Sequence, residues 1–129
     1  MKQGEIFEKY FDVTPEVYKT FTDIFNDKNP LHTDELYAKS KGFDSKVMHG
    51  NILGGFLSYF IGECLPDKNV IIHSQSIKYR RPVYLNDRLK LTGYVEGVYE
   101  SVKTIEIKFS FLNQNNIKVA SGTIQISNI

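Results

Sequence analysis

The spacing of apolar residues changes from a helical period to a period of two near the middle of the chain. Before Asn69, apolar residues recur at i, i+3 and i+4, which is the spacing of a helix face. From Asn69 onward they alternate with polar residues, as in strands that are buried on one side only. The pattern predicts an α+β fold with a helical first half, followed by a curved antiparallel sheet wrapped around one buried helix.

Two helices are expected before the central one. The first is capped by Thr14, with Pro15 in its first turn, where the missing N–H does no harm. The second is expected over residues 33–40, with Thr33 as its cap and Gly42 as its stop.

The central helix is expected over residues 48–61, whose apolar side chains fall on all sides. A helix that is apolar all round is normally buried, and the strands that follow supply a surface to enclose it. Gly54 and Gly55 weaken the helix intrinsically, so we expect another element to approach its backbone closely.

A weakly alternating first strand is marked by Ile6, Tyr10 and Phe11. Clearer strands are expected over residues 70–79, 89–97, 105–111 and 120–126. Turns are expected at 100–101 and 113–116, where polar residues cluster between the alternating runs.

Composition describes one globular domain spanning residues 1–129, with 41% hydrophobic and 24% charged residues. A formal net charge of +1 gives no electrostatic reason to expect nucleic acid or membrane partners. The single Cys64 fits a reducing compartment, and charged residues interrupt the N-terminus where a signal peptide would be apolar. We therefore expect a cytoplasmic protein.

The candidate chemistry lies in the polar loop between the first two helices. Asp27 can accept a proton, and His32 can hold or pass one near neutral pH. Pro30 fixes its own φ and restricts Asn29, whose side chain can bond to the backbone two residues on, so the loop should be a defined turn. A purely structural interpretation stays open, in which Asp27 ends one helix and His32 precedes the Thr33 cap of the next.

Two segments carry a resemblance to a known family. Residues 25–32 read FNDKNPLH and residues 47–53 read VMHGNIL. Together they resemble the signature of the MaoC-like, R-specific enoyl-CoA hydratases, which have the hotdog fold. Later segments, at 75–79, 81–84 and 86–87, resemble that family too, so the similarity covers almost the whole chain.

The resemblance implies roles for individual residues. Asp27 and His32 match the catalytic pair, Gly50 matches a backbone donor of the oxyanion-hole type, and Ser58 matches a serine that some members place beside the pair. The expected substrate-binding residues are Asn29, Asn51, Ser58 and Arg81.

Three positions depart from the family pattern. Asn26 stands where glycine is usual, Phe25 where a small residue is usual, and Asn51 where methionine is frequent. These departures bear on loop shape and pocket size. Arg81, with the basic residues near it, can meet the phosphates of coenzyme A, although a solvated sheet edge explains the same charges.

The implied activity is that of a hydro-lyase that needs no cofactor. It adds water reversibly and in syn fashion to trans-2-enoyl-CoA, or to the acyl carrier protein (ACP) thioester, and gives the (R)-3-hydroxyacyl thioester. We also expect a homodimer or a dimer of such dimers. A metal site formed by Asp27, His32 and His49 lacks the usual zinc ligand spacing, and none is expected. Two alternatives keep the fold: a non-catalytic acyl-thioester-binding protein, or an acyl-CoA thioesterase.

Overall fold

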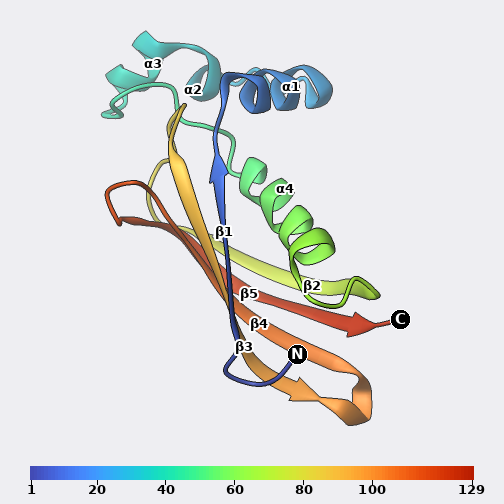
Figure 1. The fold of residues 1–129 in the computed structure, drawn as a ribbon. Coiled ribbons are helices and arrows are strands. Elements are labelled where there is room, and N and C mark those ends of the chain that lie inside the picture. The colour runs from blue at the N-terminus through green and yellow to red at the C-terminus, as the bar shows by residue number, and fades with distance from the viewer.

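Five antiparallel strands form one curved sheet (Figure 1). The computed structural model describes residues 1–129. Across the sheet the strands run in the order β1-β3-β4-β5-β2. Their bounds are β1 Ile6–Asp12, β2 Val70–Tyr79, β3 Arg88–Tyr99, β4 Thr104–Leu112 and β5 Lys118–Asn128. The expected α+β class and all five expected strands are confirmed.

The helices lie before and beside the sheet. Their bounds are α1 Pro15–Phe25, α2 Pro30–Thr33, α3 Glu35–Ser40 and α4 Asn51–Tyr59. The last of them continues as a single π-helical turn, Phe60–Cys64. Figure 1 shows α1, α2 and α3 grouped at one end of the sheet, with α4 running along one side of it.

The cap of α1 is as expected, but the cap of α3 is not. The hydroxyl of Thr14 accepts a hydrogen bond from the Val17 N–H at 3.1 Å. The predicted cap at Thr33 is wrong, because Pro30 starts a helical turn early and Thr33 becomes the last residue of α2. Asp34 caps α3 instead, and its carboxylate accepts a hydrogen bond from the Tyr37 N–H at 3.1 Å.

The core lies between α4 and the sheet. Leu53, Leu57 and Phe60 of the α4 segment are buried against the inward-facing residues of β3, β4 and β5. Gly93 of β3 makes room for this packing, because a β-carbon there would come within 2.9 Å of the Phe60 ring. The helix is covered on one side only in the single chain, and Tyr59 on the other side is 50% exposed.

Alternation of buried and exposed positions holds along the central strands. In β3 the side chains of Leu89, Leu91 and Val95 are fully buried, as the period of two predicts. No helix in the chain has the length and apolar character needed to span a membrane. The sheet is the scaffold of the molecule, and one of its ends carries the helices that shape the site (Figure 1).

Candidate active site

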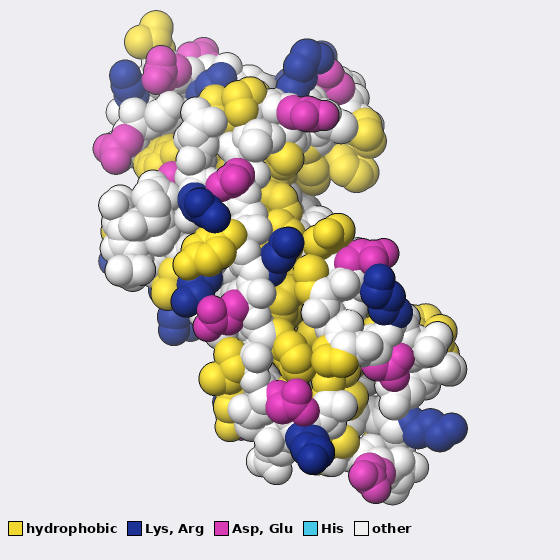
Figure 2. All heavy atoms as spheres, in the orientation of Figure 1, with side chains coloured by type: hydrophobic (Ala, Val, Ile, Leu, Met, Phe, Trp, Pro, Cys, Tyr) yellow, Lys and Arg dark blue, Asp and Glu magenta, His cyan; other side chains and the backbone are white.

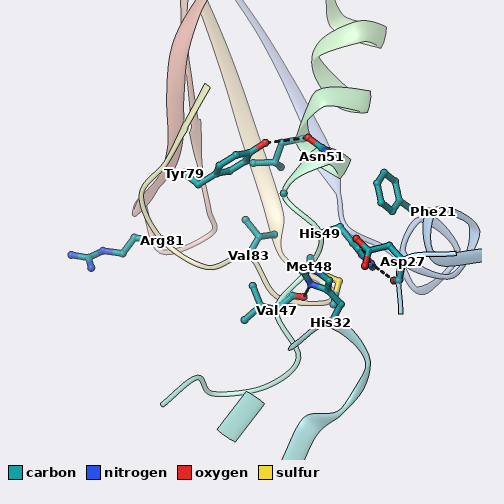
Figure 3. Close-up of a pocket in the computed structure, with 12 residues that line it drawn as sticks. Phe21, Asp27, His32, Val47, Met48, His49, Asn51, Tyr79, Arg81 and Val83 are labelled. Carbon is teal, nitrogen blue, oxygen red and sulfur yellow. Dashed lines mark hydrogen bonds and ion pairs between the residues drawn. The ribbon is translucent and has the colours of Figure 1, made fainter. Parts of the chain in front are cut away.

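A pocket of about 400 Å³ opens where the loop after α1, the segment before α4 and the end of β2 meet (Figure 3). Its volume falls in the range of about 300–1,000 Å³ that is usual for small-molecule sites. Five of the residues singled out in the sequence line it: Asp27, His32, Gly50, Asn51 and Arg81. Residues far apart in the chain are thus brought to one cavity by the folding of the helical end onto β2.

Asp27 reaches the pocket because α1 ends abruptly before it. Asn26 takes the left-handed conformation at φ 54°, which terminates the helix and turns the chain. The Asp27 side chain is 49% exposed. One of its carboxylate oxygens accepts a long hydrogen bond of 3.4 Å from the Asn29 N–H. The carboxylate therefore keeps lone pairs free for a ligand.

His32 is held from two sides. Its Nδ1 lies 2.7 Å from the carbonyl oxygen of Val47, and because a carbonyl only accepts, Nδ1 carries the proton. The Tyr18 hydroxyl donates to the His32 carbonyl at 2.6 Å. With Nδ1 engaged, Nε2 is the ring nitrogen that remains available to the pocket.

The separation of Asp27 and His32 suits a shared water molecule. A carboxylate oxygen of Asp27 and a ring nitrogen of His32 lie within 4.8 Å of each other. Two hydrogen bonds of about 2.8 Å that meet at a water at a roughly tetrahedral angle span about 4.6 Å. A separation within this limit lets one water bridge the two side chains.

His49 lies against this pair (Figure 3). Its ring stacks on the His32 ring, with centroids 4.0 Å apart and planes inclined by 29°. The side-chain atoms of Asp27, His32 and His49 that can bind a metal all lie within 4.8 Å of one another, which is close enough for them to share one ion. Each ring, however, already has one nitrogen facing a main-chain carbonyl oxygen: Nδ1 of His32 at 2.7 Å and Nε2 of His49 at 2.9 Å.

Gly50 lies at the entry to α4, under the ring of Tyr79. Its N–H makes no hydrogen bond within the chain, as expected for the first turn of a helix. The Tyr79 hydroxyl donates to the side-chain oxygen of Asn51 at 3.4 Å (Figure 3). Partial burial raises the pKa of Tyr79, which keeps this phenol neutral and a donor. The free N–H of Gly50 thus lies in a wall of the pocket, beside a fixed ring.

Two expected site residues lie elsewhere. Asn29 is exposed and caps α2, where its side chain accepts a hydrogen bond from the Leu31 N–H at 3.0 Å. Ser58 is exposed on α4 and lines neither this pocket nor the neighbouring groove. Conversely, Phe21 and Tyr79 line the pocket without having been singled out. Their place depends on how α1 and β2 pack on the start of α4, which no local pattern records.

An apolar groove adjoins the pocket. It encloses about 850 Å³ between α1 and α4. Phe21, Asp27 and Asn51 line both cavities, so the two lie side by side. Ile24 and Phe25 of α1 border the groove and remain 69% and 66% exposed. Figure 2 shows hydrophobic side chains reaching the surface at this helical end of the molecule.

Comparison with known proteins gives consistent matches. The sequence matches the family described as MaoC like domain over residues 1–114. It is 32% identical to an (R)-specific enoyl-CoA hydratase of Rhodospirillum rubrum, covering 84% of this chain and 75% of that protein. It is 28% identical to a mitochondrial 3-hydroxyacyl-[acyl-carrier-protein] dehydratase of Arabidopsis thaliana, covering 95% of this chain and 74% of the relative.

A solved structure agrees with the sequence matches. The unliganded R-hydratase PhaJ1 from Pseudomonas aeruginosa superposes with a TM-score of 0.89 at 26% identity, covering 99% of this chain and 82% of that one. The expected hotdog fold is thereby confirmed.

Proposed function

This chain belongs to the MaoC-like domain family and is a hydro-lyase of that family, and on this premise we propose that Asp27, His32 and Gly50 carry its reaction. The reaction is the reversible syn addition of water to a trans-2-enoyl thioester of CoA or ACP, giving the (R)-3-hydroxyacyl thioester. The observation that carries the proposal is the meeting of a carboxylate, an imidazole and a free helix-entry N–H at one pocket.

The first step uses the water held between Asp27 and His32. Asp27 removes a proton from that water while His32 orients it, and the water oxygen forms a bond to Cβ of the substrate. The π electrons of the double bond move toward the thioester and give an enolate. A proton then passes from the pair to Cα on the same face, so the addition is syn and the pair returns to its starting state. Proton transfer of this kind is worth about 10²–10⁴-fold in rate.

The enolate charge needs a donor at the thioester oxygen. The Gly50 N–H is free, and it lies at the N-terminal end of α4, where the helix dipole favours negative charge. A donor fixed in advance in this way stabilises the charge as it develops, and losing one such donor typically costs about 10²–10³-fold in kcat.

The surroundings of the pocket orient the substrate. Arg81 lies at one side of the pocket and extends away from it (Figure 3), where a guanidinium can meet the phosphates of coenzyme A. The apolar groove between α1 and α4 opens on the Asp27 side and suits the acyl chain. In this pose the thioester lies next to the catalytic pair, with the carrier on the Arg81 side and the acyl chain in the groove.

We also propose that two chains pair through β2. This ten-residue strand, Val70–Tyr79, lies at the edge of the sheet, with most of its residues exposed. Its Ile71 and Tyr79 side chains are each 50% exposed, and an open strand edge of this length favours pairing with another strand. A homodimer, or a dimer of dimers, would extend the sheet across the junction.

A direct assay tests the function. Incubation with trans-2-crotonyl-CoA should remove the enoyl absorbance and yield (R)-3-hydroxybutyryl-CoA, with no metal or cofactor added. Binding of enoyl thioesters without turnover would instead favour a non-catalytic binding protein. Release of free thiol from a saturated acyl-CoA would favour a thioesterase. Either of these results, without hydration, contradicts the proposal.

A further inference from the structure

His49 is sealed inside the helical end of the molecule. The residue is 3% exposed. Its ring lies between the aromatic rings of Phe21, at a centroid distance of 4.9 Å, and His32, at 4.0 Å. Tyr18 lies a little farther away, at 6.0 Å. Only 2% of the side chain is exposed, at the edge where His49 lines the pocket.

The hydrogen bonds of His49 fix a single tautomer. Nε2 lies 2.9 Å from the main-chain carbonyl oxygen of Asp27, which can only accept, so Nε2 carries the proton. Nδ1 is buried and has no partner. No group of the chain is placed to share a proton with Nδ1, so the hydrogen bond to Asp27 is the one that fixes the ring. With Nε2 bonded to the backbone and Nδ1 enclosed, the contacts of His49 are those of a structural support for its neighbours.

The bond from His49 ties the Asp27 loop to the start of α4. Within the loop, the Asp27 carboxylate has only the 3.4 Å contact with the Asn29 N–H. The His49 N–H to the Asp27 carbonyl is shorter, and it connects residues 22 positions apart. The same ring supports one face of His32, and its own backbone leads directly into Gly50. The His49 side chain thus contacts both Asp27 and His32, and its backbone adjoins Gly50.

We propose that His49 is a positioning residue that sets the mutual placement of Asp27, His32 and Gly50. The inference rests on the proposed function for its effect on rate, although the contacts themselves do not depend on it. Displacement of a catalytic group by about 1 Å can cost about 10²-fold in rate. Loss of the bond to Asp27 should therefore lower kcat, while the pocket that binds the substrate stays in place.

Two substitutions separate the hydrogen bond from the packing. His49→Phe keeps a planar ring against His32 but removes the donor to Asp27. His49→Gln keeps an N–H that can reach the Asp27 carbonyl but gives up the ring. Ile107→Val, a buried change in β4 far from the pocket, provides a control for destabilisation alone.

The test combines kinetics on crotonyl-CoA with NMR of the full chain. We expect His49→Phe to lower kcat about 10²-fold with KM within about threefold of wild type. His49→Gln should stay within about tenfold of wild type, and Ile107→Val should lower the melting temperature without changing kcat. Equal kcat losses in the Phe and Gln variants, or no greater loss in His49→Phe than in Ile107→Val, would overturn the proposal.

The NMR readout does not depend on activity. The wild-type ring of His49 should show a proton on Nε2 and none on Nδ1. Amide exchange at His32 and Val47, whose N–H groups bond to the carbonyls of Asn29 and Leu31, should become faster in His49→Phe than in Ile107→Val. If wild type does not hydrate any enoyl thioester, the proposed function fails, and the tautomer and the exchange rates alone decide the positioning role. A proton on Nδ1, or unchanged exchange, contradicts that role.

Discussion

The ring of Tyr79 lies over Gly50 so closely that a β-carbon on residue 50 would come within 2.9 Å of two ring carbons. The end of β2 and the start of α4 therefore meet at a position where only glycine fits without movement. This close approach shapes one wall of the pocket and places the free N–H of Gly50 beside the Tyr79 ring.

Gly50→Ala should force this ring to move. We expect a loss of about 1 kcal/mol in the free energy of unfolding, at the low end of the cost of overpacking because the half-exposed ring can shift, measured by urea denaturation. Adding Tyr79→Leu should remove most of that cost, because the ring is the obstructing group. Equal costs in the wild-type and Tyr79→Leu backgrounds would show that the contact does not constrain residue 50.

Gly54→Ala is the matched control on the same helix. The close approach of another element that was expected at Gly54 and Gly55 is wrong for the single chain, because a β-carbon at either position would meet nothing within 4 Å. Gly54 lies in the helix interior. The substitution should therefore stabilise the protein by about 0.5–1 kcal/mol, through the lower conformational entropy of the unfolded chain. Opposite signs at the two glycines are the expected result.

Filling the groove should alter acyl-chain selectivity. Gly55 lines the groove and has open space around its β-carbon position. Each buried methylene contributes about 0.8 kcal/mol, or roughly fourfold in affinity. Gly55→Leu should therefore lower kcat/KM for trans-2-octenoyl-CoA at least about tenfold more than for crotonyl-CoA. Gly62→Leu, also in open space but outside the groove, is the control. Equal losses on both substrates would place the acyl chain elsewhere.

The strands were predictable because their signal is local. The segment 70–79 was expected as a strand, and β2 has the same bounds. Inward-facing residues such as Leu91 and Ile107 follow directly from a period of two. Sequence also placed Asp27 and His32 in one short turn, since Pro30 restricts the chain between them.

The features that the sequence did not predict depend on contacts between distant segments or on competition between neighbouring turns. Thr33 was the expected cap, but the early turn at Pro30 makes it the last residue of α2 and leaves Asp34 to cap α3. The hydrogen bond from His49 to Asp27 spans two helices. The apolar pattern also predicted a helix buried on all sides, but α4 is exposed near Tyr59 because no other segment of the single chain covers that side.

The His32→Asn variant keeps the hydrogen bond of residue 32 to the backbone but removes the ring nitrogen that is proposed to act on the water. The asparagine amide can still donate to the Val47 carbonyl, as Nδ1 does in wild type, but nothing replaces Nε2. We expect kcat for crotonyl-CoA to fall about 10²–10⁴-fold, with the free energy of unfolding within about 1 kcal/mol of wild type. His73→Asn, an exposed histidine of β2 outside the pocket, should leave kcat unchanged. Full activity in His32→Asn would exclude Nε2 from the reaction.

The most direct measurement is the rate of crotonyl-CoA hydration by Asp27→Asn, set beside Asp23→Asn. Both side chains are about half exposed, at 49% and 54%, and Asp23 pairs with Lys19 on α1, away from the pocket. The two variants should therefore unfold within about 1 kcal/mol of wild type. Asp27→Asn should lose about 10²–10⁴-fold in kcat while Asp23→Asn keeps the wild-type rate. Hydration by Asp27→Asn at the wild-type rate would contradict the assignment of this carboxylate as the base that activates water.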